Sequence, residues 1–204
     1  MNLLFDQIQS LLQSPSPRSI IGIGGAPGAG KSTVVSEIEK RFNPSEVCVI
    51  AMDGYHFSDE KLKELGRYER KGAPDTFDPM AFISLLTKVK SDHKSEHRFP
   101  IFHREIEASI EDEGIVPSSA KVIVIEGNYL FSEEHNWNGV FPLLDHTWFI
   151  EIDNEVRIQR LIARHVKFGR TPEVGEERSR GTDEANARFI GLTAHRATGI
   201  IKLT

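Results

Sequence analysis

Short apolar runs alternate along the chain with segments whose apolar residues recur at helical spacing. The apolar runs are typical of strands, and they cover residues 19–24, 47–52, 122–125, 147–152 and 199–203. The helical segments between them cover residues 31–42, 79–90, 154–167 and 173–192. Nearly continuous apolar strands indicate a sheet that is covered on both faces, and the alternation with helices predicts an open, mostly parallel α/β sheet. Ligands of such sheets bind beyond the carboxyl ends of the strands.

Two further segments complete this pattern. Leu4, Ile8, Leu11 and Leu12 recur at helical spacing with glutamines between them, which predicts a packed terminal helix rather than a partner-binding one. This stretch lacks the basic segment and the continuous apolar run of a signal peptide. Residues 91–118 are the least regular part of the chain, and residues 98–102 and 105–110 are compatible with a small hairpin or flap.

Composition limits the classes of function. A chain of 204 residues is long enough for one core and short for two, so residues 1–204 are expected to form a single domain. The net charge of -5 gives no electrostatic reason to bind nucleic acid or an anionic membrane. Cys48 is the only cysteine and lies within an apolar run, which suggests a buried reduced thiol and a cytoplasmic location.

The first strand is followed by a phosphate-binding motif. Residues 25–32 satisfy G-x-x-x-x-G-K-[ST], with an apolar strand before them and a helix after them. Glycines let successive backbone N–H groups converge on an anion, Lys31 reaches the outer phosphates, and the Ser32 hydroxyl can ligate Mg²⁺. A glycine-rich turn with an incidental lysine is the alternative. The expected nucleotide contacts are Gly25, Ala26, Pro27, Gly28, Ala29, Gly30, Lys31, Ser32 and Thr33.

Carboxylates end the second and third strands. Asp53 follows the run 47–52 and is followed by Gly54, which allows a tight exit, while Glu126 follows the run 122–125. If both strands flank the first strand, both carboxylates project toward the γ-phosphate. One could then hold Mg²⁺ while the other accepts the proton of an attacking hydroxyl. Both residues are also compatible with a plain capping role at a strand end.

These motifs together resemble a known family. Residues 25–32, 53–56 (Asp-Gly-Tyr-His), 71–78, 100–104 and 125–129 (Ile-Glu-Gly-Asn-Tyr) carry the likeness, which spans nearly the whole chain. They are similar to the P-loop kinases that include uridine kinase, phosphoribulokinase and bacterial pantothenate kinase. Within that group they most resemble a bacterial subgroup named fructose transport system kinase or uridine kinase-like protein.

The resemblance implies a three-layer P-loop NTPase fold with a five-stranded sheet, a helical lid and a small flap in an acceptor-side insertion at about residues 54–118. It implies transfer of the γ-phosphoryl group of ATP to an alcohol, with Mg²⁺, with Asp53 as the base and with Ser32 and Glu126 on the metal. Dimers are common in the group, so a homodimer is compatible with it. The expected acceptor contacts are Asp53, Tyr55, His56, Asp75, Phe77, Arg104 and Tyr129. Asp78 is equally compatible with a helix cap.

One stretch departs from the subgroup, which normally has an aspartate where this chain has His103, before Arg104. An arginine and a histidine there suit a polyol, a carboxylate or a phosphate. Arg104 is expected in the pocket, and an exposed loop cation is the alternative.

Arginines mark the expected lid. Arg157, Arg160 and Arg164 share one helical face, and for Arg157 a solvated position is expected. In the kinases that the chain resembles, this stretch is a lid, here about residues 160–172, whose arginines contact ATP phosphates; Arg160, Arg164 and Arg170 occupy those positions. Arg164 therefore joins Asp53 and Lys31 in the expected catalytic set. Residues 181–186 are equally compatible with a loop, a helix cap or a nucleotide contact.

Other P-loop functions fit the sequence less well. A nucleotide-dependent regulatory NTPase is the main alternative, but there is no Asn-Lys-x-Asp stretch and no Leu-Ser-Gly-Gly signature. A nucleic-acid-processing role is disfavoured by the acidic balance and by the lack of an aromatic and basic stretch. The expected partner is therefore a small-molecule alcohol such as a sugar, a nucleoside or a pantothenate-like compound, with neither nucleic acid nor membrane.

Overall fold

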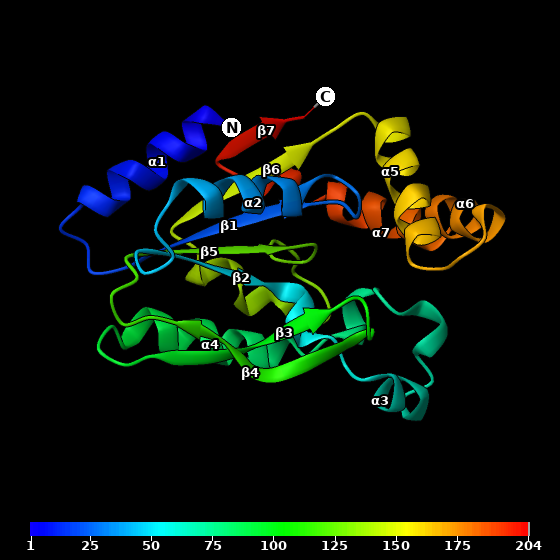
Figure 1. Ribbon diagram of the computed structural model, residues 1–204, viewed down its shortest axis with the longest axis horizontal. Helices are drawn as coiled ribbons and strands as arrows, with labels where there is room; N and C mark the ends of the chain where they lie inside the picture. Colours follow the sequence, from blue (N-terminus) through cyan, green and yellow to red (C-terminus); the bar gives the residue numbers. More distant parts are fainter. Residues whose placement is uncertain (204) are drawn as a thin grey trace.

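One sheet forms the middle of three layers in the structure, a computed structural model that describes residues 1–203 (Figure 1). Its strands are β1 (Ser19–Gly25), β2 (Val47–Ala51), β5 (Val122–Gly127), β6 (His146–Glu151) and β7 (Gly199–Lys202). They lie in the order β2-β5-β1-β6-β7, and every neighbouring pair is parallel. The five predicted strands and the α/β class are confirmed. Because β5 separates β2 from β1, the assumption that both carboxylate-bearing strands flank β1 is wrong for β2.

Helices cover both faces of the sheet. They are α1 (Asn2–Gln13), α2 (Lys31–Arg41), α3 (Asp59–Glu64), α4 (Pro79–Ser91), α5 (Asn154–Lys167), α6 (Pro172–Arg180) and α7 (Thr182–Gly191). Short 3-10 turns are η1 (Met52–Tyr55), η2 (Tyr68–Arg70), η3 (Pro74–Thr76), η4 (Trp137–Gly139), η5 (Phe141–Leu143) and η6 (Ala194–Arg196). None of the helices within residues 1–203 is long and apolar enough to cross a membrane.

The side chains of successive residues in a strand pack on opposite faces of the sheet. Ile20 belongs to the core that includes Phe82 of α4, whereas Ile21 belongs to the core that includes Leu4 of α1 and Val34 of α2. All positions of β1 and β5 are buried, as expected for parallel strands between two helical layers. The amino-terminal helix is thus packed on the sheet, as its pattern predicts.

The segment predicted as one helix over residues 173–192 is two helices. Gly181 separates α6 from α7 with φ -97° and ψ -99°, which is not a helical conformation. A Cβ at this position would lie 2.8 Å from the carbonyl oxygen of Glu177, so the close turn depends on glycine. The break starts a new helix at Thr182 and brings its first turn beside α5, where Asp183 accepts from the His165 ring at 2.9 Å.

A two-stranded hairpin lies beside the end of β2. Its strands are β3 (His97–His103) and β4 (Ala108–Val116), paired antiparallel, so the second strand begins later than the predicted residues 105–110. The hairpin rests directly on the turn after Asp53, because a Cβ at Gly54 would lie only 2.1 Å from the Pro100 carbonyl oxygen. This contact places the tip of the hairpin, with Arg104, next to Asp53.

Candidate active site

The phosphate loop connects β1 to α2 at the carboxyl end of the sheet. Gly28 and Gly30 have φ of +79° and +99°, in the left-handed region that favours glycine. Gly30 is the N-cap of α2 and offers no side chain, so the first N–H groups of α2 remain available to an anion. The loop lies on a cavity of about 670 Å³. Its residues on that cavity are Pro27, Gly28, Gly30, Lys31, Ser32 and Thr33.

The other predicted loop residues, Gly25, Ala26 and Ala29, do not line the cavity and instead contact Lys31 or the core. Lys31 Nζ donates to the carbonyl oxygens of Gly25 at 2.8 Å and Ala26 at 3.2 Å, and to Oδ1 of Asn128 at 2.6 Å. Ala29 is buried in the core between the sheet and α2. Burial lowers the pKa of Lys31, while Glu126 and Asp53 act in the opposite direction. Asn128 is not among the residues predicted as contacts, although its position two residues after Glu126 indicates that it lies at the same edge of the sheet.

The strand-end carboxylates reach the same cavity from two strands. Glu126 lies within β5, Asp53 lies in η1 directly after β2, and both line the cavity with Lys31 and Ser32. The pairing of Ala51 with Glu126 keeps the two carboxylates at the same edge of the sheet although β2 is not next to β1. The two carboxylates therefore lie together near the phosphate loop, as predicted, because β5 pairs with both β1 and β2.

The two carboxylates differ in their electrostatic surroundings. Burial raises the pKa of Glu126 to about 7, and the negative charge of Asp53 adds to this effect against the opposing effect of Lys31. Burial also raises the pKa of Asp53, but nearby cations outweigh it and the net shift is downward. Arg104 is foremost among these cations, since it donates to Asp53 Oδ2 at 2.6 Å. Asp53 is therefore a carboxylate at neutral pH, as a general base must be.

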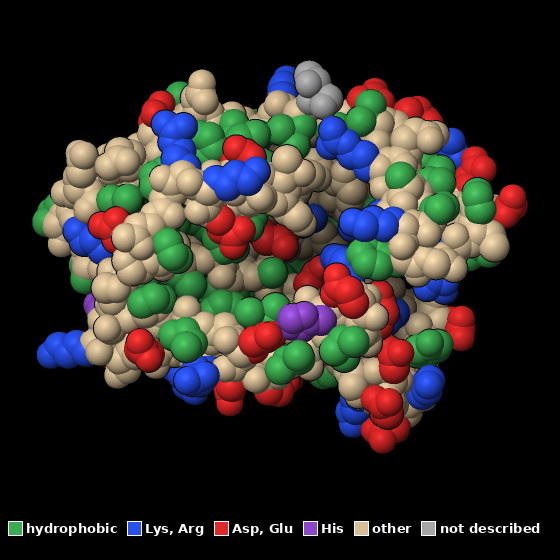
Figure 2. Space-filling model, in the orientation of Figure 1, with side chains coloured by type: hydrophobic (Ala, Val, Ile, Leu, Met, Phe, Trp, Pro, Cys, Tyr) green, Lys and Arg blue, Asp and Glu red, His purple; other side chains and the backbone are tan. Residues whose placement is uncertain are grey.

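Aromatic side chains line the other half of the cavity. The rings of His56 and Phe77 stack with centroids 3.8 Å apart, and Phe102 lies 5.4 Å from His56. Burial lowers the pKa of His56 to about 4, so its ring is neutral at pH 7. Lys71, which was not predicted as a contact, pairs with Asp59 at 2.7 Å. This half also includes Tyr68, Gly72, Arg104 and Glu107. Figure 2 shows charged side chains of both signs around the hollow beside the lobe of α5 and α6.

Among the residues that the structure describes, three predicted acceptor contacts do not line this cavity. Tyr55 packs into the core with its ring centroid 4.9 Å from that of Phe82. Tyr129 is 1% exposed and donates its hydroxyl to the Gly72 carbonyl oxygen at 2.5 Å. Asp75 instead accepts from Arg70 at 2.5 Å.

Neighbouring polar residues take structural positions. Asp78 caps α4, with Oδ1 accepting from the Ala81 N–H at 2.9 Å, which favours the capping alternative. His103 lies on the hairpin, where its ring bonds Glu113 at 2.5 Å. The side chain at position 103 therefore makes a contact within the hairpin, while Arg104 beside it reaches Asp53.

The predicted lid arginines share the cavity with the phosphate loop. Arg160 and Arg164 come from α5, and Arg170 comes from the segment before α6. The expectation of a solvated Arg157 is wrong, because this side chain is only 3% exposed. It lies against the phosphate loop, where NH1 donates to the Pro27 carbonyl oxygen.

The parallel sheet, the phosphate loop and the carboxylates at its edge define the class of P-loop kinases. A profile of the Phosphoribulokinase / Uridine kinase family matches residues 20–200, and the chain belongs to this family. It is thus a small-molecule kinase that uses ATP.

Individual relatives agree with this assignment. A uridine kinase of Borrelia hermsii is 34% identical over 193 residues, covering 89% of this chain and 85% of the relative. A Schizosaccharomyces pombe protein provisionally named uridine kinase C227.14 is 31% identical over 197 residues, covering 92% and 83%. A crystal structure of a provisionally named fructose transport system kinase from Silicibacter sp. TM1040 has a TM-score of 0.83 and 29% identity, covering 96% of this chain and 97% of the other.

Proposed function

We propose that the protein transfers the γ-phosphoryl group of ATP to a hydroxyl of an uncharged small metabolite, a sugar or a nucleoside. The observation that carries this proposal is the meeting of Lys31, Asp53 and Arg164 on one cavity with the phosphate loop. Phosphoryl transfer depends mostly on positioning and on charge stabilisation, and these side chains supply both. The names of the relatives support the reaction class and leave the acceptor open.

Each residue has a defined task in this reaction. The N–H groups of the loop and of α2 bind the phosphates, and Lys31 exchanges its carbonyl partners for the outer phosphates. Asp53 orients the acceptor hydroxyl and takes its proton when the oxygen attacks phosphorus. Arg164, with Arg160 and Arg170, adds positive charge on the transferring group and excludes water when the lid closes.

The metal fits the same edge of the sheet. Mg²⁺ is commonly held by one or two protein oxygens together with phosphates and water, and Ser32 and Glu126 offer such a pair on the cavity. A cation there would compensate the burial that raises the pKa of Glu126 to about 7. When bound, Mg²⁺ would neutralise charge on the β- and γ-phosphates.

The charges around the aromatic half favour an uncharged acceptor. Lys71 already pairs with Asp59 at 2.7 Å and with Glu107 at 3.3 Å, and Arg104 already pairs with Asp53. A phosphate or carboxylate on the acceptor would have to compete with these carboxylates, whereas a polyol can accept and donate hydrogen bonds without displacing them. The faces of His56 and Phe102 suit a sugar ring or a base.

The test is a screen of ADP release with a coupled assay over hexoses, nucleosides, pantothenate and glycerate. We expect a hexose or a nucleoside to raise ADP formation well above the rate without acceptor, and Lys31→Ala to abolish the increase. If ADP formation rises only with an anionic acceptor, such as pantothenate or glycerate, the assignment of an uncharged substrate is contradicted. A rate of ATP hydrolysis that no acceptor changes would contradict the proposed transfer and favour a regulatory NTPase.

A further inference from the structure

Helix α5 rests directly on the phosphate loop through the stretch from Arg157 to Leu161. A Cβ at Gly28 would lie 2.8 Å from Leu161 Cγ and 2.9 Å from the carbonyl oxygen of Arg157. No side chain therefore fits between the loop and the helix at this point. The path of the loop and the position of α5 depend on each other.

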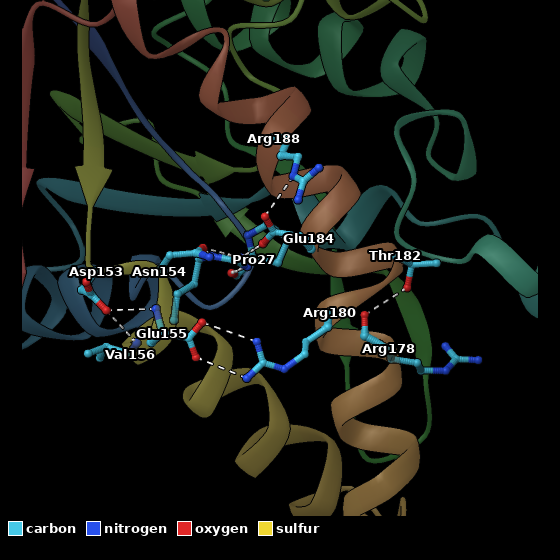
Figure 3. A network of polar contacts seen from close by, with 11 residues as sticks. Pro27, Asp153, Asn154, Glu155, Val156, Arg178, Arg180, Thr182, Glu184 and Arg188 are labelled. Carbon is cyan, nitrogen blue, oxygen red and sulfur yellow. Dashed lines mark hydrogen bonds and ion pairs between the residues drawn. The ribbon is translucent and has the colours of Figure 1, made fainter.

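The Arg157 side chain joins three segments at this contact. Its NH1 donates to the Pro27 carbonyl oxygen at 3.3 Å, and its Nε and NH2 donate to Oδ1 of Asn154 at 3.0 and 2.8 Å. NH2 also forms an ion pair with Glu184 of α7. Figure 3 shows Pro27, Asn154 and Glu184 converging from the loop, α5 and α7. One buried guanidinium thus connects the phosphate loop with both helices.

A second ion pair, between α5 and α6, has a different character. Arg180 of α6 contacts Glu155 of α5 at 3.3 Å, and their side chains are 46% and 64% exposed. Exposed pairs of this kind contribute little to stability, and this one does not involve the loop. The Arg157 and Glu184 side chains are 3% and 17% exposed, so their attraction is screened less by solvent. Glu184 is held further by Arg188, whose Nε donates to Oε1 at 3.1 Å.

The helix that this pair fixes also carries the lid arginines. Arg160 and Arg164 follow Arg157 on α5 by about one and two turns and line the nucleotide cavity. Since α5 is a continuous helix, a tilt at its contact with the loop would displace both cations from the phosphates. A misplacement of about 1 Å in the active site, caused by a mutation far from the reacting atoms, can cost about a hundredfold in rate.

We propose that Arg157 and Glu184 are positioning residues, which fix α5 on the phosphate loop and so place Arg160 and Arg164 on the phosphates of ATP. Neither residue touches the reacting atoms. The inference rests on the proposed function for its nucleotide, and it is independent of the acceptor.

The test measures binding of ATP and of ADP by calorimetry, without acceptor, for Glu184→Gln, Arg157→Lys and the control Arg180→Gln. Urea unfolding of each variant, at the temperature of the binding measurement, checks that the variant is fully folded without denaturant. We expect Glu184→Gln and Arg157→Lys to weaken ATP binding by about tenfold, and ADP binding less, because the lid arginines act on the outer phosphates. Arg180→Gln should leave both affinities unchanged. Glu184→Gln keeps the shape of the side chain, so it tests the proposal even if Arg157→Lys does not fold.

A double-mutant cycle with Arg164→Gln distinguishes positioning from a general loss of structure. If Glu184 acts through the lid, its substitution should cost much less ATP affinity in the Arg164→Gln background than in the wild type. The proposal is overturned by wild-type ATP affinity in Glu184→Gln, by a loss in Arg180→Gln equal to that in Glu184→Gln, or by fully additive losses in the cycle. The phosphate site is tested separately by comparing ATP binding to the wild type and to Lys31→Ala. If the wild type does not bind ATP, or if Lys31→Ala binds it equally well, the proposed function fails, whatever the role of Arg157 and Glu184.

Discussion

Replacement of Gly28 by alanine tests how closely the phosphate loop is held by the helix behind it. Gly28 has φ +79°, and an added Cβ would lie 2.8 Å from Leu161 Cγ and 2.9 Å from the Arg157 carbonyl oxygen. The left-handed conformation costs a residue with a Cβ about 1–2 kcal/mol, and overpacking adds about 1–3 kcal/mol. We therefore expect Gly28→Ala to lower the free energy of unfolding by about 2–5 kcal/mol, or to move the loop away from α5.

A matched control separates strain from crowding. Gly66 has φ +65° with no heavy atom within 4 Å of an added Cβ, so Gly66→Ala should cost only the conformational term of about 1–2 kcal/mol. Urea unfolding measures both variants, and calorimetry measures their affinity for ADP with Mg²⁺. A displaced loop loses charge-assisted hydrogen bonds to phosphate worth about 1.5–3 kcal/mol each, so ADP should bind at least about tenfold more weakly to Gly28→Ala. Equal destabilisation of the two variants with unchanged ADP affinity would contradict the close contact between Gly28 and α5.

Further variants test the supporting structure. Arg18 is 6% exposed and donates to carbonyl oxygens that include Ala120 at 2.9 Å and Val89 at 3.0 Å, so Arg18→Lys should lower the unfolding free energy by about 2–4 kcal/mol in urea titrations. A midpoint unchanged from wild type would show that these bonds are replaceable. Burial raises the pKa of the Cys48 thiol to about 11, so at pH 8 it is almost entirely the unreactive thiol, and a disulfide reagent should label it only as the chain unfolds. Rapid labelling of the folded protein would contradict its burial. Tyr129→Phe leaves the Gly72 carbonyl oxygen without its 2.5 Å partner and should cost about 1–2 kcal/mol of stability while ATP affinity, measured by calorimetry, is retained. A loss of ATP affinity alone would place Tyr129 in the nucleotide site instead.

The sequence predicts the parts of this protein that depend on local pattern. The strands follow from apolar runs, and the loop follows from a motif whose residues are contiguous. The break at Gly181 is missed because helical periodicity continues on both sides of a single glycine. The sheet order is missed because nothing in the run before Asp53 indicates that β5 lies between β2 and β1.

Side-chain environment is less predictable than the elements themselves. Arg157 is buried only because Glu184 of α7 and the loop come together on it, and these partners are distant in the chain. Tyr55 follows the expected base, yet η1 turns it into the core. Lys71 is not predicted as a cavity residue, because its pairing with Asp59 of α3 depends on the fold and not on a local pattern.

Turnover of the Asp53→Asn variant, with the acceptor that the screen identifies, tests whether Asp53 is the general base. Asparagine keeps the shape of the side chain but cannot take the proton of the acceptor hydroxyl. We expect kcat to fall by a factor on the order of 10²–10⁴ with ATP affinity largely retained, because general base catalysis contributes about this much. Turnover by Asp53→Asn at the wild-type rate would contradict this role.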